Sequence, residues 1–286
     1  MSKLSDLIRT HRLFSVFAFL AFLVIIIAII SPLIVPYDPY DAVTREALQP
    51  PSADHWFGTD KLGRDLFSRV VCASRTSLFS AFILVSCVTV IGSVLGIIAG
   101  YFGGAVDNVI MRFSDMMISF PGLVLAIAIA GILGPSLLNA IIAITAVSWT
   151  KYARLARSLV LKIKSKDYVA AGKLTGSKTK RMLFRYMLPT SLPTLLITAT
   201  MDIGKMMLEL AALCFLGFGA QPPTPEWGLM MNEGRLYLQT APWLLIFPGL
   251  AMFIVVVIFN MLGDSLRDIM DPRFRRKVRR KEVKNA

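Results

Sequence analysis

Histidine, cysteine and charged side chains are all scarce in this chain of 286 residues. The two histidines, His11 and His55, lie far apart, and the three cysteines show no clustered spacing. Metal sites and disulfide frameworks both require such residues at recurring short spacings. The sequence therefore predicts neither a metal site nor a disulfide framework. The cysteines, which we expect to be packing residues, are Cys72, Cys87 and Cys214.

The sequence also lacks the short motifs of hydrolases and nucleotide-binding enzymes. It contains no Gly-x-x-x-x-Gly-Lys phosphate loop, no Gly-x-Ser-x-Gly nucleophile elbow and no His–Glu metal pair. We therefore expect no catalytic residue, no cofactor and no ATPase site on this chain. An intramembrane enzyme is not favoured for the same reason. Energy for any active process would come from a partner.

Apolar residues replace the missing charge. Charged residues make up 17% of the chain, against about 25% in an ordinary soluble protein, and 55% of the residues are hydrophobic. Several apolar stretches approach the ~20 residues that cross a hydrocarbon layer as a helix. We therefore predict an all-α fold, a polytopic membrane helix bundle with six transmembrane helices. The predicted spans are residues 14–35, 78–101, 116–133, 137–149, 188–216 and 243–262.

The formal net charge of +13 follows the expected membrane topology. Basic residues concentrate in residues 1–13, in the segment 151–187 and in the tail 263–286, whereas the charges of residues 36–75 nearly balance. Short Lys/Arg-rich loops are retained in the cytoplasm. We therefore expect a multi-pass membrane protein with both termini in the cytoplasm, and no nucleic-acid partner. The first apolar run is too long for a signal peptide and is expected to remain uncleaved.

The outer loop contains a segment with helical periodicity. Its apolar residues recur every three to four positions over residues 59–70, and Thr59 or Asp60 could cap the helix. We expect an amphipathic helix that lies along the membrane interface. We accordingly divide the chain into residues 1–75, a span and outer loop with this helix, and residues 76–286, a transmembrane core with the cytoplasmic loop 151–187. The periodic apolar residues are Leu62, Leu66, Phe67 and Val70.

The cytoplasmic loop carries the most specific pattern. Asp167-Tyr168-Val169-Ala170-Ala171-Gly172-Lys173-Leu174-Thr175-Gly176 is followed, after nine residues, by Tyr186-Met187-Leu188-Pro189. The spacing resembles the cytoplasmic signature of binding-protein-dependent ABC importer permeases: Glu-Ala-Ala, three residues, Gly, nine residues, a variable pair and Leu-Pro. Residues 55–70, 215–231 and 263–273 resemble the peptide/nickel branch of this family, in the subunit with the shorter outer domain. Residues 202–208 and 231–232 resemble the nickel type more than the oligopeptide type.

This resemblance implies a type I ABC importer permease fold in a bacterial cell (inner) membrane. It implies as partners a second homologous permease, two ABC ATPase subunits that bind ATP and Mg²⁺, an extracytoplasmic solute-binding protein and membrane lipid. It also implies a cargo among dipeptides, oligopeptides, nickel and metal chelates. With only two separated histidines, a chelate is favoured over the bare metal if the cargo is a metal.

The resemblance also implies that a coupling helix over residues 166–180 docks on the ATPase. Ala170 stands where the family has Glu, and Gly172 where it has its second Ala, so docking would depend on shape and backbone. Glycine costs about 0.5–1 kcal/mol inside a helix, and a partner packed against it would explain Gly172. The alternative is an ordinary surface helix. The expected coupling residues are Asp167, Ala170, Ala171, Gly172, Lys173, Gly176, Leu188 and Pro189.

Three ionisable residues interrupt the fifth apolar run. Asp202, Lys205 and Glu209 are spaced to share one helix face. A charge at the bilayer centre costs at least ~2.5–3.5 kcal/mol, so these residues should face protein or water. They are expected either to line the translocation path or to form a bracing network. In a secondary transporter or channel, the competing class, they would be ion sites.

The Pro-rich outer segment 221–228 has no helix or strand periodicity. Pro222, Glu226 and Trp227 are candidates for an outer gate or for contact with the binding protein. The alternative is a rigid connector, with Trp227 at the membrane interface.

Overall fold

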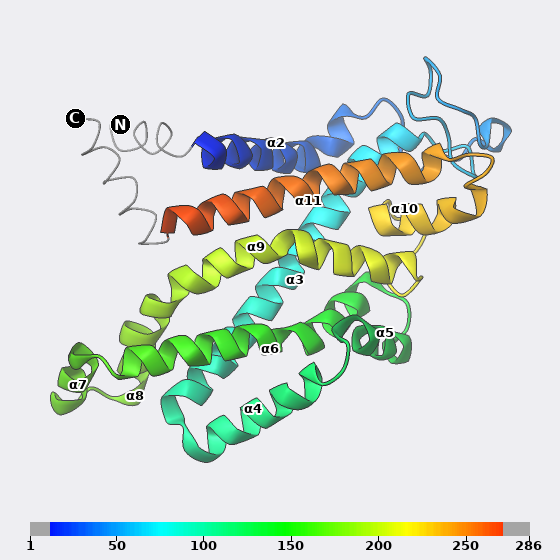
Figure 1. The fold of residues 1–286 in the computed structure, drawn as a ribbon. Coiled ribbons are helices and arrows are strands. Elements are labelled where there is room, and N and C mark those ends of the chain that lie inside the picture. Colours follow the sequence, from blue (N-terminus) through cyan, green and yellow to red (C-terminus); the bar gives the residue numbers. More distant parts are fainter. Residues whose placement is uncertain (1–11, 271–286) are drawn as a thin grey trace, which may run out of the picture.

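The computed structural model describes residues 12–270 and shows an elongated bundle of helices (Figure 1). The long helices are α2 (Arg12–Ile34), α3 (Leu66–Phe102), α6 (Leu137–Lys164), α9 (Leu188–Phe215) and α11 (Trp243–Met270). Shorter helices are α4 (Gly104–Ile118), α5 (Gly122–Leu133), α7 (Asp167–Leu174), α8 (Thr179–Met182) and α10 (Trp227–Gly234). Short 3-10 helices at Thr44–Glu46 and Arg235–Tyr237 and a π-helical turn at Leu183–Met187 complete the elements. No strand is formed within residues 12–270, so the expected all-α fold is confirmed.

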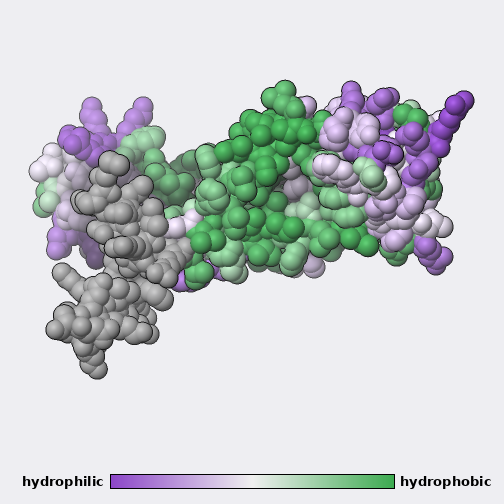
Figure 2. Space-filling model, turned by 90° about the horizontal axis from the view of Figure 1, so that it is seen from above, coloured by the Kyte–Doolittle hydropathy of each residue, from purple (hydrophilic) through white to green (hydrophobic). Residues whose placement is uncertain are grey.

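The surface has the polarity of a membrane protein. A broad apolar band covers the middle of the molecule and hydrophilic residues gather at both ends (Figure 2). Many large apolar side chains are exposed, among them Leu33 at 86% and Ile132 at 87%. Lipid is the solvent that accepts such a surface without penalty.

Within residues 12–270, three helices are long and apolar enough to cross a membrane: α2, α3 and α11. A fourth crossing is possible if α4 and α5 form one broken span, but they are bent by 93° at Ser119–Pro121. α6 and α9 have 28 residues each, about 42 Å of helix, and carry more polar residues. The expected six spans remain a prediction, and the expected continuous third span is replaced by this bent pair.

The two ends of the bundle are formed by different elements (Figure 1). The loop before α3 occupies one end, whereas α7 and α8 lie at the other. The described part of α2 begins, and that of α11 ends, near the α7–α8 end. The basic residues 1–11 and 271–286, on which the expected cytoplasmic termini rest, lie outside the described residues.

The expected amphipathic helix over residues 59–70 is wrong. The Asp60 carboxylate accepts hydrogen bonds from the backbone N–H of Leu62 (2.8 Å) and Arg64 (3.0 Å), which folds residues 60–64 into a turn. Gly63 has φ +75°, which ends any helical path there. The helix begins only at Leu66, where Asp65 caps the N–H of Ser68 at 2.7 Å. It then continues into the bundle as α3 instead of lying along the interface.

Close packing of α3 on α6 forms the centre of the bundle. Gly92, Gly96 and Gly100 line the contact face of α3, and added Cβ atoms at Gly92 and Gly96 would clash with the backbone of α6. Small residues at four-residue spacing let two helix backbones approach closely, which is how helices associate inside lipid. Carbonyl oxygens of Trp149 and Ala153 occupy the space next to these glycines. α3 and α6 are therefore held at a fixed separation.

We expect Gly96→Ala to lower the melting temperature of the purified protein. The added methyl group would push against the Ala153 carbonyl oxygen, and such overpacking typically costs ~1–3 kcal/mol. Gly131→Ala in α5 is the matched control, because its Cβ would lie 3.7 Å from Phe218 with room to spare. The control should be neutral or slightly stabilising, since Ala is the better helix former. Equal melting temperatures for both variants would contradict the close-packed seam.

Candidate functional site

A buried carboxylate connects α9 to α6 midway along both helices. Asp202 of α9 is only 6% exposed. The Lys151 ammonium of α6 donates to both carboxylate oxygens at 2.7 Å, and the Tyr152 hydroxyl donates to Oδ2 at 2.9 Å. Asp202 is thus neutralised by an ion pair and an additional hydrogen bond, as a buried charge requires.

This arrangement corrects the expected grouping of Asp202 with Lys205 and Glu209. The partner of Asp202 is Lys151, which we had assigned to the cytoplasmic loop, although α6 runs unbroken to Lys164. Lys205 instead contacts Glu209 on its own helix, with 3.4 Å between Nζ and Oε1. Lys151 is a functional candidate that sequence reasoning missed.

Lys205 and Glu209 line a cavity of about 260 Å³ between the α4–α5 elbow, α6 and α9. The Lys205 side chain is 60% exposed and that of Glu209 is 26% exposed. Most of the remaining wall is apolar. The other lining residues are Met117, Ile118, Phe120, Gly122, Leu123, Ala126, Ile144, Val147, Ser148, Thr150, Lys151 and Met206.

A second open cavity, of about 600 Å³, lies between α6, α9 and α11. Lys151 lines both cavities, and Arg267 and the hydroxyl-bearing Thr194 and Thr198 line the second. Polar groups therefore follow α9 from Glu209 towards the end of the molecule that holds α7. Within residues 12–270, no three His, Cys, Asp or Glu residues are grouped to hold a metal ion.

The signature segment folds into a short helix and a turn instead of the expected helix over 166–180. α7 ends at Leu174, and the Ser177 N–H bonds the Gly172 carbonyl at 3.1 Å while Gly176 adopts φ +76°. A glycine in this left-handed conformation is a common helix C-terminal cap. Gly176 therefore terminates α7, and it is not part of a helix that extends to residue 180.

Gly172 packs inside the protein, and its neighbours on α7 face outward. A Cβ at Gly172 would lie 3.3 Å from the Tyr186 ring, so its smallness serves an internal contact. Asp167, Ala170 and Ala171 are exposed, and Leu174 is 89% exposed. The side chain of Lys173 lies outside the described part of the chain.

The Leu-Pro of the signature opens α9. Leu188 is its first residue and is half-buried, whereas Pro189 is exposed in the first turn, where a missing N–H costs nothing.

At the opposite end, Glu226 and Trp227 are buried. Glu226 caps α10 by accepting from the Leu229 N–H at 2.8 Å, and it also accepts from the Ser77 hydroxyl of α3 at 3.0 Å. Burial raises the pKa of the Glu226 carboxyl, although these hydrogen bonds counter part of the shift. The Trp227 indole N–H donates to the Val70 carbonyl at 3.0 Å. Both residues fasten α10 to α3, and only Pro222 of the three candidates is exposed.

The sequence had indicated Trp227 as a residue of an interfacial belt, and the structure contradicts this. Trp227 is 2% exposed and packs among protein groups. The role of this segment as an outer gate stays a prediction.

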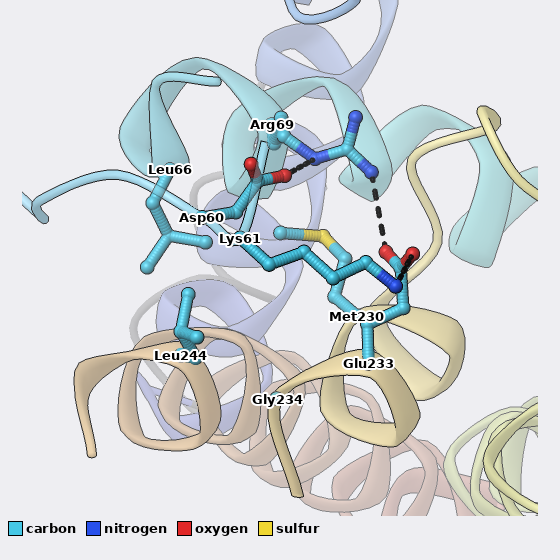
Figure 3. A pocket seen from close by; sticks show the side chains of 8 residues that line it. All are labelled: Asp60, Lys61, Leu66, Arg69, Met230, Glu233, Gly234 and Leu244. Atoms are coloured by element: carbon cyan, nitrogen blue, oxygen red, sulfur yellow. Dashed lines mark ion pairs between the residues drawn. The ribbon is translucent and has the colours of Figure 1, made fainter. Parts of the chain in front are cut away.

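A buried charge cluster braces the same end (Figure 3). Arg69 of α3 is 1% exposed, and its Nε lies 3.4 Å from Asp60 Oδ2 while its Nη2 lies 3.8 Å from Glu233 Oε2 of α10. Arg64 approaches the same two carboxylates at 2.6 and 3.6 Å. Lys61 contacts Glu233 at 3.1 Å. The cluster joins the loop before α3 to α10, and its members come from sequence stretches about 170 residues apart, a pairing that no local spacing could reveal.

The profile of one known family matches residues 92–276: binding-protein-dependent transport system inner membrane component. The chain belongs to this family. It is therefore a membrane-embedded ABC transporter permease.

Similarity to known permeases over most of the chain supports this. The chain is 48% identical over 228 residues to the dipeptide transport system permease protein DppC of Alkalihalophilus pseudofirmus, covering 80% of this chain and 75% of that protein. It is 44% identical over 238 residues to the nickel transport system permease protein NikC of Escherichia coli (strain K12), covering 83% and 86%. It is also 41% identical over 243 residues to the glutathione transport system permease protein GsiD of Pectobacterium atrosepticum, covering 85% and 81%.

The fold is shared with a solved transporter. An inward-facing structure of the MetNI methionine ABC transporter aligns with a TM-score of 0.57 at 18% identity, covering 72% of the permease and 98% of that chain. The predicted importer-permease fold is thereby confirmed.

We expect Tyr152→Phe to destabilise the permease by about 1 kcal/mol, because the buried Asp202 loses a hydroxyl donor. Tyr101→Phe is the matched control, since no hydrogen bond of the Tyr101 hydroxyl stabilises the described structure. Thermal unfolding of the purified variants measures the difference. A melting temperature for Tyr152→Phe equal to that of the control would contradict the role of this hydrogen bond.

We expect His55 to make the permease more stable in mild acid. Burial lowers the His55 pKa, but hydrogen bonds to Asp65 (2.9 Å) and Glu46 (3.3 Å) outweigh it and raise the pKa above 6.5. The stabilisation is complete below the ordinary value of 6.5 and is lost as the pH rises through the raised folded-state pKa. Between about pH 5.5 and about pH 8.5 the melting temperature should fall further in the native protein than in His55→Gln. Parallel curves for the two proteins would contradict this.

Proposed function

We propose that the permease forms one half of the translocation path of an ATP-driven importer for di- or oligopeptides or for a nickel chelate. The observation that carries the proposal is Lys205, a charged side chain of α9 that is 60% exposed. A lysine in this place cannot face lipid at an acceptable cost, so the surface around it must face water or a protein partner. The cavity beside Lys205 supplies such a surface.

A second, homologous permease would close this surface. In the isolated chain the cavity is open, and apolar residues of α4, such as Val109 (70%) and Met116 (57%), are exposed. A partner packed against α4, α5 and α9 would shield Lys205 from lipid and enclose the path. The complete importer would add two ATPase subunits and an extracytoplasmic binding protein.

The α7 end is the proposed contact with the ATPase. Leu174 is exposed at the tip of a short helix among the small residues Ala170 and Ala171. An apolar side chain on a smooth helix is suited to insert into a groove of a soluble partner. This end, with the basic residues of α6, would lie in the cytoplasm, and we propose the same side of the membrane for both termini.

The cargo class rests on the named relatives, which transport dipeptides, nickel and glutathione. A bare metal ion is disfavoured because the described residues group no metal ligands. A secondary transporter that uses Asp202 as an ion site is also disfavoured, because Lys151 and Tyr152 already satisfy both Asp202 oxygens.

Uptake by cells with and without this permease tests the function, with labelled dipeptide and labelled nickel plus a chelator as cargoes. We expect loss of one of the two uptakes on deletion, and the same loss when the ATPase partners are deleted. Uptake that depends on the permease but not on the ATPases would overturn the importer assignment.

Leu174→Glu should abolish that uptake while leaving the protein in the membrane, because a charge would not enter an apolar groove. Lys178→Glu, also exposed in the same loop, is the matched control and should retain most of the activity. Full uptake by Leu174→Glu would remove α7 as the docking helix.

A further inference from the structure

We propose that Lys205 is the carboxylate-recognition residue of the translocation path, with Glu209 as the counter-charge for a cationic group of the same cargo. This inference rests on the proposed function and narrows its cargo to solutes that carry a free carboxylate. The site is the cavity between the α4–α5 elbow, α6 and α9.

Among the described residues that line the cavity, Lys151 and Lys205 are the cations, and only Lys205 is without a buried carboxylate partner. Lys151 is engaged with both oxygens of Asp202, and Tyr152 adds a third bond to that carboxylate. Lys205 has three N–H donors, and its one ion-pair partner within residues 12–270 is Glu209, with 3.4 Å between Nζ and Oε1. Donors of Lys205 that do not face Glu209 can bind a ligand in the cavity.

The Lys205–Glu209 pair opens easily. Lys205 precedes Glu209 by four residues, which is the less favourable order for a helical ion pair. Half-exposed pairs of this kind contribute little to stability, because water and entropy offset the attraction. A ligand carboxylate can therefore replace Glu209 at the Lys205 ammonium without a large cost to the fold.

The released Glu209 then faces the ligand. A zwitterion such as a dipeptide presents a carboxylate and an ammonium, and the two side chains stand one helical turn apart on α9. Pairing both ends at once would favour a zwitterion over a cation or an anion of equal size.

The lining of the cavity suits the uncharged part of a dipeptide. Phe120, Leu123 and Met206 give an apolar lining, and Ser148 adds a hydroxyl. A volume of about 260 Å³ lies just below the range of drug-sized pockets. The cavity is therefore matched to a dipeptide or to one end of a longer peptide.

Ligand binding at this site can be measured directly, without the binding protein, as protection of a cysteine in the cavity wall from a thiol reagent. Leu123 lines the cavity and is 42% exposed, so Leu123→Cys in a Cys87→Ala background places a reactive thiol in the wall. The assembled transporter in proteoliposomes is labelled in the presence of alanyl-alanine, its C-terminal amide or nickel chloride. Ile83→Cys on α3, which is exposed and does not line the cavity, reports any general effect on labelling.

We expect alanyl-alanine to protect the Leu123→Cys thiol. Its C-terminal amide should need a roughly tenfold higher concentration for the same protection, which corresponds to ~1.4 kcal/mol of binding free energy. Adding Lys205→Met should raise the half-protecting concentration of alanyl-alanine by the same factor, and Lys205→Arg should restore it. Nickel chloride should give no protection. Unchanged labelling of Ile83→Cys shows that each variant is assembled.

Equal protection by the acid and the amide, protection that survives Lys205→Met, or no protection by alanyl-alanine would each overturn the proposal. The proposed function is tested separately, by the uptake assay with and without the permease. A chain that transports peptide but shows no carboxylate-dependent protection keeps its function and loses this site.

Discussion

The carboxylate of Asp202 is buried midway along α9, and a charge in that place must be neutralised by protein. Lys151 and Tyr152 do so from α6, through three hydrogen bonds of 2.7 to 2.9 Å. α6 and α9 are also the two helices that flank α7 and α8 in the sequence. The segment proposed to contact the ATPase is therefore attached at both of its ends to helices joined by this one ion pair. The cavity with Lys205 and Glu209 is built on the same two helices and the α4–α5 elbow.

Other contacts hold the helices that surround the Lys151–Asp202 ion pair. The glycine face of α3 fixes α6 at close distance, and Glu226, Trp227 and Arg69 fasten α10 to the first turns of α3. Charge is thus buried and paired at the α10 end and at mid-height. From the level of Tyr152 towards the α7 end, small residues carry the packing, as is typical of helices in lipid.

Sequence reasoning recovered what local pattern determines. The apolar runs located α2, α3, α6, α9 and α11, and the spacing of the signature identified the permease family later confirmed by the comparisons. The helix expected over 59–70 failed because the Asp60 side chain and the positive φ of Gly63 favour a turn, although the apolar spacing is helical. Local competition of this kind is not visible in hydrophobic periodicity.

The pairings of the site required the fold. Asp202 and Lys205 share a helix and a suitable spacing, yet Asp202 bonds to a lysine 51 residues away. Gly172 was interpreted as a surface for a partner, whereas its space is filled by Tyr186. In both cases the neighbour of the residue differs from the predicted one, because neighbours between helices depend on how the helices pack.

A double-mutant cycle on Lys151 and Asp202 tests the central ion pair most directly. The free energy of unfolding of the purified permease would be measured for Lys151→Met, Asp202→Asn and the double variant. We predict a coupling free energy of at least about 0.5 kcal/mol between the two positions, with the second substitution costing much less than it does alone. Additive effects, within about 0.3 kcal/mol, would show that Lys151 does not hold Asp202 and that α6 and α9 are joined by other means.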